Sequence, residues 1–309
     1  MTRTREDGKE EVFSACIKPD DTRYLGGNKH SSVNAIKLQG RPRTGINYDK
    51  ANEFCANRGD WITMIDYLEY CALQALCYIE YANFDNQATL NTNLTSDGFK
   101  QGGLGNGVTN LNWEVWTAFN GHNPIVQTYW TAEHNIGNGS TNGDHYELGN
   151  YNADGSNLST YPVIYRGILN FFGDIWTLIR DVVIINKDKD YNYVYILKKG
   201  VNHADVTKDN VNEKCYLIGY QANTNNFITE FDFQRGVYFI PNKVGSNKKA
   251  DYNWIGNNDG QDTDKAARLL LLGGCASTGP EAGSGRFTSH WVRSVSDAHV
   301  GFFTTVKLD

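Results

Sequence analysis

Apolar positions in the first part of the chain recur at helical spacing. The segment YDKANEFCANRG, residues 48–59, has this pattern and closes on a glycine, which is typical of a helix end. A second run after Asp60 and Trp61 has apolar positions three and four residues apart, at Ile65, Leu68, Ala72, Ala75, Leu76 and Ile79. The spacing predicts a second helix that buries this one stripe.

The later part of the chain has the pattern of strands. Three runs rich in Tyr, Val and Ile are bounded by turn residues: YNYVYILKKG (191–200), EKCYLIGYQ (213–221) and GVYFIPNKVG (236–245). The run AARLLLLGG (266–274) predicts a buried strand. Helices early, short strands late and no strand–helix alternation predict an α+β fold with an antiparallel sheet.

Two regions have no sustained pattern. Residues 1–43 mix charges with small residues, so we expect an N-terminal arm or extension without a core of its own. Residues 86–160 are rich in Asn, Gly, Ser and Thr, which predicts long surface loops. We therefore expect the arm to be followed by one domain, residues 44–309.

Composition narrows the partners of this domain. Apolar residues make up 40% of the chain and aromatic residues 13%, enough for a packed core. A net charge of −6 without a Lys/Arg stripe argues against a nucleic-acid partner. No apolar stretch reaches the roughly 18 residues of a membrane span, and the start MTRTREDGKEEVF lacks the apolar core of a secretory signal. We expect neither membrane insertion nor this route of export.

The cysteine spacing does not match a metal or redox motif. The chain has six cysteines and no C-x-x-C pair: Cys16, Cys55, Cys71, Cys77, Cys215 and Cys275. Cys71 and Cys77 would lie about 120° apart around the second helix, which disfavours a disulfide between them. We expect reduced thiols.

Signatures of catalysis and metal binding are weak. The chain has no G-x-S-x-G elbow, and NYNADG at 150–155 begins like a calcium loop but has Tyr161 at the position of the bidentate Glu. One Gly/Asn-rich loop holds potential metal ligands without a spacing that would converge them, at Glu133, His134, Asp144, His145 and Glu147. We expect no cofactor and no metal.

The C-terminal segment 269–303 combines glycines at intervals with exchangeable polar side chains. His290 and His299 flank Trp291, Arg293 and Asp297, a set that mixes an aromatic anchor with charge and hydrogen-bond donors. Such a set suits a binding surface; an ordinary last hairpin with one buried Trp is the alternative.

Four ordered stretches carry a family resemblance. The first runs from ANRGDWITMIDYLEY over residues 56–87, and the second is YPVIYRGILNFFGDIW (161–176). The third runs from YLIGYQANTNNFITE over residues 216–246, and the fourth is LLLLGGCASTGPEAGSGRF (269–287). Together they resemble the variable proteins of diversity-generating retroelements and related bacteriophage tail-tip receptor-binding proteins, the major tropism determinant group. The resemblance implies a C-type-lectin-like fold of the formylglycine-generating-enzyme type, with two helices on short antiparallel sheets and long loops.

The resemblance also assigns roles within 269–303. It implies a backbone scaffold at Gly273, Gly274, Gly279, Gly283, Gly285, Phe287 and Gly301. It implies exchangeable, ligand-contacting side chains at Cys275, Ser277, Pro280, Ser284, Arg286, Thr288, His290, Trp291, Val292, Arg293, Ser294, Ser296 and His299.

The function implied is hypervariable receptor binding without enzymatic activity. The partner would be a bacterial cell-surface protein or glycan, and the location the phage tail, with the bacterial surface as the alternative; a homotrimer is left open. Enzymes of the same fold need a close cysteine pair or a histidine-rich iron site, and this chain has no cysteine after Cys275. A formylglycine-generating-type oxidoreductase and a non-binding structural virion component are the alternative functions.

Overall fold

A computed structural model places the chain in the α+β class expected from its sequence, with few helices and many short strands. The description covers residues 2–12, 24–25, 45–86, 146–148, 158–160, 164–166, 168–169, 171–173, 175–186, 188–233, 236–246, 251–256, 267–275, 278, 281–297 and 299–307. Most of the expected loop region 86–160, including the calcium-like stretch 150–155, lies outside these residues.

Both predicted helices are confirmed, and local capping fixes their ends. Helix α1 (Tyr48–Arg58) begins where the Asn47 side chain accepts from the Lys50 N–H at 2.9 Å. It ends at Gly59, whose φ of 146° suits glycine and whose N–H donates to the Cys55 carbonyl. Helix α2 (Tyr67–Tyr81) begins with a capping box between Asp66 and Glu69.

The buried face of α2 differs from the predicted stripe. The helix buries Tyr67, Tyr70, Cys71, Gln74, Cys77 and Tyr78. Of the predicted stripe, Ile65 is buried just before the helix, whereas Leu68, Leu76 and Ile79 are 47%, 45% and 78% exposed. Tyrosines take the buried face because each ring buries a large area while its hydroxyl can hydrogen-bond in the interior. Tyr67, for example, donates to the Phe239 carbonyl at 2.7 Å.

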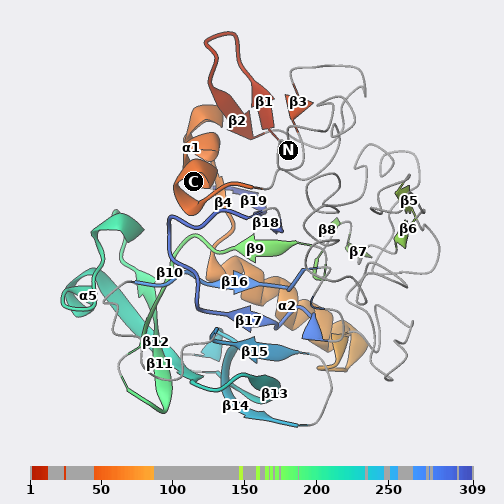
Figure 1. Cartoon of the computed structure of the whole chain (residues 1–309), viewed down its shortest axis with the longest axis vertical. Coiled ribbons are helices and arrows are strands. Elements are labelled where there is room, and N and C mark those ends of the chain that lie inside the picture. Colours follow the sequence, from red (N-terminus) through yellow and green to blue (C-terminus); the bar gives the residue numbers. More distant parts are fainter. Residues whose placement is uncertain are drawn as a thin grey trace.

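A seven-stranded sheet lies in front of α2 in Figure 1. Across the sheet its strands are β14 (Ile240–Gly245), β13 (Asn226–Asp232), β15 (Tyr252–Trp254), β17 (Phe287–Thr288), β16 (Leu271–Leu272), β9 (Trp176–Leu178) and β18 (Val300–Gly301). The expected antiparallel pairing holds for four of the six strand pairs of this sheet, whereas β15 pairs with β17 and β18 pairs with β9 in parallel. The C-terminal strands insert between or beside strands formed earlier in the chain, so their direction is set by the loops that return them.

The predicted strand 266–274 is buried but short. Residues Leu269 to Leu272 are at most 1% exposed, yet only Leu271 and Leu272 form β16. Arg268 adds isolated bridges to Ile184 and Val292. The segment is therefore an irregular extended chain in the core.

A second, antiparallel sheet follows the predicted strands closely. It orders β10 (Val182–Asn186), β11 (Tyr191–Leu197) and β12 (Cys215–Ala222), with the turn η4 (His203–Asp205) and short helix α5 (Val211–Lys214) between the last two. Val183, Ile185, Tyr195, Val206, Val211 and Cys215 form its own buried cluster. The strand predicted over 236–245 is confirmed in its second half as β14.

Short pairs complete the described elements. Strand β19 (Thr304–Val306) pairs with β4 (Ile62–Met64), which brings the C-terminal strand beside the segment that joins the two helices. The remaining strands are β1 (Thr2–Thr4), β2 (Glu10–Val12), β3 (Tyr24–Leu25), β5 (Tyr146–Leu148), β6 (Leu158–Thr160), β7 (Ile164–Tyr165) and β8 (Ile168–Leu169). None of the described helices is both long and apolar enough to cross a membrane.

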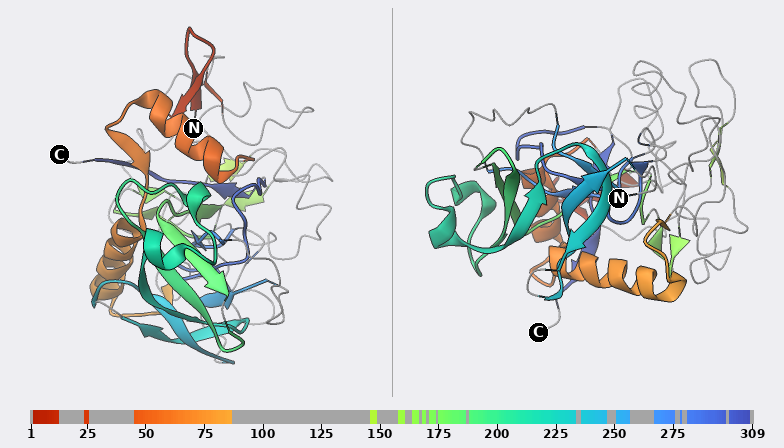
Figure 2. Two further views of the ribbon diagram at one scale, coloured as in Figure 1. Left: turned by 90° about the vertical axis from the view of Figure 1, so that its left-hand side faces the viewer. Right: turned by 90° about the horizontal axis from the view of Figure 1, so that it is seen from below.

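The N-terminal hairpin of β1 and β2 packs on α1 (Figure 2). Val12 is buried in the same cluster as Phe54, and the Asn57 amide donates to the Glu10 carbonyl at 2.7 Å. Glu11 is buried and forms ion pairs with Arg3 and Arg58. This part of the 1–43 extension therefore shares the core cluster that α1 helps to form.

Candidate ligand-binding surface

The predicted binding segment falls into two parts with different burial. We call residues 281–289 the inner part and 290–297 the outer part. Apart from Glu281, every residue of the inner part is buried, whereas no residue of the outer part is. The outer part leads from β17 toward β18.

Five residues expected to be exchangeable and exposed are instead buried: Cys275, Ser284, Arg286, Thr288 and His299. Ser277 and Pro280 lie outside the described residues. The buried hydroxyls of Ser284 and Thr288 are tolerated inside because they hydrogen-bond to Asn86 and His290. The expectation of one outward-facing surface over the whole segment is thus wrong for the inner part.

Arg286 has an internal role. Its guanidinium lies over the rings of Trp176, Tyr252 and Trp254 at 5.4, 4.5 and 5.9 Å from their centroids. Its Nη1 is 2.6 Å from a Glu281 carboxylate oxygen. Burial lowers its pKa, and the Glu281 charge opposes that shift. These contacts tie strands β9 and β15 to the inner part, because a cation over aromatic faces is stabilised where water is excluded.

A buried polar network holds the inner part against α2. The Asp251 carboxylate accepts from the Tyr78 hydroxyl at 2.9 Å and from the Asn86 amide at 3.2 Å, and Ser284 donates to Asn86 at 3.0 Å. Burial raises the pKa of Asp251 to about 7. The network links helix, strand and inner part through groups that water does not reach.

Glycine is required where the inner part passes this network. A Cβ on Gly285 would lie 2.5 Å from the Asp251 carboxylate and 2.7 Å from the Phe231 ring. Gly273 and Gly274 have φ of 89° and 79°, values that favour glycine. These three positions agree with the predicted scaffold, and Gly279 lies outside the described residues.

The outer part is held by its backbone and leaves side chains accessible. The Leu269 N–H donates to the Trp291 carbonyl at 2.8 Å, and Arg268 Nη1 donates to the His290 carbonyl at 2.8 Å. His290, Trp291, Val292 and Arg293 are half-buried, and Ser294 and Ser296 are exposed. These bonds hold the backbone of the outer part at His290 and Trp291 against the extended segment that precedes β16.

Aromatic contacts position His290 and Trp291. The His290 ring is 6.1 Å from Trp254 and 5.0 Å from Trp291, and its Nδ1 is 2.9 Å from the Thr288 hydroxyl. Burial, with help from nearby positive charges, lowers the pKa of His290 to about 4, so the imidazole is neutral near pH 7. Trp291 also packs against the core cluster that includes Trp176. The outer part therefore presents aromatic edges and one cation, that of Arg293.

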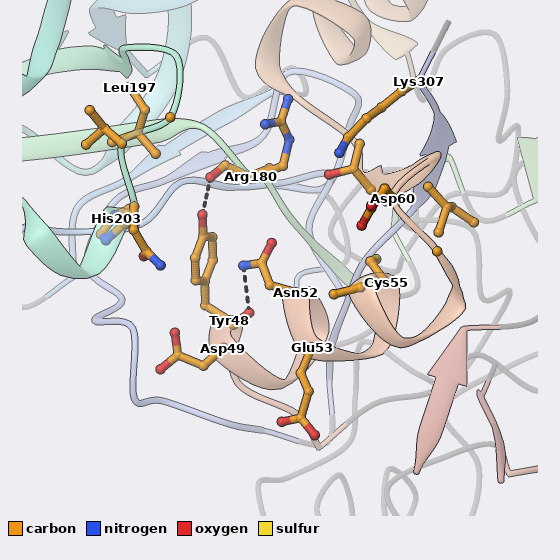
Figure 3. Close-up of a pocket in the computed structure, with 17 residues that line it drawn as sticks. Tyr48, Asp49, Asn52, Glu53, Cys55, Asp60, Arg180, Leu197, His203 and Lys307 are labelled. Carbon is orange, nitrogen blue, oxygen red and sulfur yellow. Dashed lines mark hydrogen bonds between the residues drawn. The ribbon is translucent and has the colours of Figure 1, made fainter. Parts of the chain in front are cut away.

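A cleft of about 680 Å³ adjoins the outer part (Figure 3). Asp49 lines this cleft, and its carboxylate lies 3.5 Å from Arg293 Nε. Sequence reasoning treated 48–59 only as a helix and did not select these residues. The available signal was a run of polar side chains, Asp49, Asn52 and Glu53, at helical spacing.

The described cysteines are buried, and the described acids form no metal site with them. Cys55, Cys71, Cys77 and Cys215 are buried free thiols, as expected, and burial raises the pKa of the first three to about 12. Cys275 is also buried. No group of three His, Cys, Asp or Glu side chains within the described part of the chain could hold a metal ion. Cys16, Glu133, His134, Asp144 and His145 fall outside that part.

No family model matches the sequence, and no curated protein is significantly similar to it.

Proposed function

We propose that the protein is a receptor-binding display protein without enzymatic activity, with the outer part as its ligand-contacting segment. The partner is a bacterial cell-surface protein or glycan, and the protein belongs to a phage tail tip, or else to a bacterial surface. The observation that carries the proposal is the outer part itself: accessible aromatic, cationic and hydroxyl side chains on a backbone that is hydrogen-bonded to the extended segment just before β16.

The proposed contact residues are His290, Trp291, Val292, Arg293, Ser294 and Ser296. The half-buried Trp291 supplies an anchor of low conformational freedom, and the two serines at the exposed tip accept substitution without changing the core. The five buried residues among those first expected to contact the ligand instead belong to the interior that carries this surface. Exchange of side chains is then confined to the outer part.

A C-type-lectin-like fold is part of the proposal. It is supported by two helices, one of them packed on a sheet of short strands, and by the order of the four resembling stretches along the chain. The formylglycine-generating-type activity has no supporting observation among the described residues.

A purely structural virion role is the second candidate. It is favoured by the apolar side chains that α2 leaves exposed, Leu68, Leu76 and Ile79. Such a face suits assembly with further copies, including a homotrimer, and its use does not require ligand contact at the outer part.

The test introduces bulk and charge at the tip of the outer part. Ser294→Arg together with Ser296→Arg is expected to abolish binding of the labelled protein to those members of a panel of bacterial strains that the wild type stains. Because both serines are exposed, the unfolding free energy should change by less than about 0.5 kcal/mol per site. The matched control, Ser246→Arg, alters an exposed serine just after edge strand β14 and should leave binding intact.

Undiminished staining by the double variant would overturn the outer part as the contact segment. Absence of staining by the wild type on every strain, together with a stable homo-oligomer that Ile79→Glu dissociates, would favour the structural role.

A further inference from the structure

The cleft beside the outer part has the volume of a small-molecule site and many polar lining residues. Helix α1 supplies one wall with Tyr48, Asp49, Asn52 and Glu53, and the loop that leads into η4 supplies Asn202. Its volume of about 680 Å³ lies within the usual range of about 300–1,000 Å³ for small-molecule sites. Tyr48 donates through its hydroxyl to the Arg180 carbonyl, which joins α1 to the loop between β9 and β10.

One side of the cleft carries two cationic side chains, Arg180 and Lys307. Figure 3 shows Arg180 and Lys307 at one side, with Asp60 near Lys307, and Asp49 and Glu53 at the other side. Arg180 is oriented by an ion pair with Asp66 at 3.2 Å, whereas the Lys307 ammonium makes no ion pair with another described residue. Both cations also act on the nearby Cys55 thiol: burial raises the pKa of this thiol, and the positive charges of Arg180 and Lys307 oppose the rise.

The other side offers hydrogen-bond acceptors. The Asp49 carboxylate is paired with Arg293 at 3.5 Å and the Glu53 carboxylate with Lys50 at 2.7 Å, so their charges are already balanced. The Asn52 amide lies between the two sides, held by a donated bond to the Tyr48 carbonyl at 3.1 Å. Carboxylates balanced in this way still accept hydrogen bonds from hydroxyl groups through their remaining lone pairs.

We propose that this cleft binds an acidic sugar, with the sugar carboxylate at Arg180 and Lys307 and its hydroxyls at Asp49, Asn52 and Asn202. A neutral sugar would bring no carboxylate to the pair of cations Arg180 and Lys307, and a small inorganic anion would leave the acceptors of the α1 wall unused. Asp60 also lines the cleft and serves as a further acceptor for hydroxyls. The site stands on the geometry of the cleft and does not depend on the proposed display function.

The experiment is an NMR titration of the ¹⁵N-labelled full chain with glucuronate, glucose and inorganic phosphate in parallel. Glucuronate should shift the amides of Asn52, Asn202 and Lys307 saturably and bind at least about tenfold more tightly than either of the other two, since only it satisfies both sides. Lys307→Gln should weaken glucuronate about tenfold, because the exposed ammonium is removed without disturbing the core. Lys243→Gln, at an exposed ion pair on β14, is the matched control and should change nothing.

Equal affinity for glucuronate and glucose, or equal affinity for glucuronate and phosphate, would overturn the acidic-sugar assignment. Unchanged glucuronate binding in Lys307→Gln would overturn the site. The Ser294→Arg, Ser296→Arg variant should still bind glucuronate, so failure of the display function and failure of this cleft are read out separately.

Discussion

The inner and outer parts of the C-terminal segment are adjacent in sequence and similar in composition, yet they have opposite environments. The inner part, 281–289, includes the central strand β17 of the seven-stranded sheet, and it buries an arginine, two serines and a threonine. The outer part, 290–297, has a comparable share of polar residues and is accessible. Small polar side chains on a glycine framework therefore do not by themselves indicate exposure.

The difference arises from what each part meets. The polar side chains of the inner part have interaction partners in the interior. Ser284 hydrogen-bonds to Asn86, and the Arg286 guanidinium contacts aromatic rings and pairs with Glu281. The outer part is bonded to the core mainly through its backbone, at the Arg268 and Leu269 positions. Substitution should consequently damage folding in the inner part and be tolerated in the outer part.

The largest contrast is expected between two arginines. Arg286→Ala removes the buried guanidinium that lies over the rings of Trp176, Tyr252 and Trp254, so the free energy of unfolding should fall by about 3 kcal/mol. Arg293→Ala, the matched change in the outer part, removes only an accessible ion pair and should cost less than about 1 kcal/mol. Urea unfolding followed by tryptophan fluorescence measures both.

Arg286→Lys refines the result, because lysine keeps the charge but not the planar group that stacks on rings. It should lie between wild type and Arg286→Ala. Equal losses for Arg286→Ala and Arg293→Ala would remove the distinction between the two parts.

The second contrast is in pH dependence. Burial raises the pKa of Asp251 to about 7, so its protonated form is favoured in the folded protein. That contribution is complete below the unfolded pKa near 3.8 and is lost as pH rises through about 7. From pH 5 to pH 8 the wild type should therefore lose about 2 kcal/mol relative to Asp251→Asn. Urea titrations at several pH values test this.

His290 in the outer part should show the opposite sign. Its pKa is lowered to about 4, so its contribution is present above the unfolded pKa near 6.5 and is lost as pH falls toward 4. The wild type should thus lose stability relative to His290→Gln on acidification. The same sign for both variants would contradict the assigned burial of one of the two groups.

Local patterns in the sequence predicted the elements better than their surroundings. The two helices and the strands β11, β12 and β14 follow from periodicity, β-branched residues and turn residues. The predicted buried face of α2 is wrong because the periodicity of its aliphatic residues points to the exposed side of the helix, whereas its tyrosines form the buried side. Those tyrosines are buried through partners far away in the chain, such as Phe239 and Asp251, which a local pattern does not contain.

Site prediction failed for a related reason. Arg286 and Thr288 are residue types that usually lie at the surface. The burial of Arg286 depends on Trp176, Tyr252 and Trp254, which come from other strands and contact its guanidinium. The parallel pairs of the sheet depend on returning loops, not on local propensity. Asp49 contacts Arg293 across more than 240 residues, so no local spacing could have indicated that contact.

The smallest expected effect is the coupling energy between Arg293 and Asp49. It measures how much a side-chain contact contributes to holding the outer part in place. Arg293 and Asp49 lie 3.5 Å apart with side chains 35% and 53% exposed. A double-mutant cycle of Arg293→Ala and Asp49→Ala should give a coupling energy of about 0.2–1 kcal/mol, decreasing with added salt, since accessible ion pairs are screened by solvent and ions. A coupling above about 2 kcal/mol would mean that the outer part is fixed through its side chains as the inner part is, and exchange of those side chains would then not be free. A weak coupling instead assigns the rigidity of the outer part to its backbone bonds, which every substituted side chain at Arg293, Ser294 or Ser296 would leave in place.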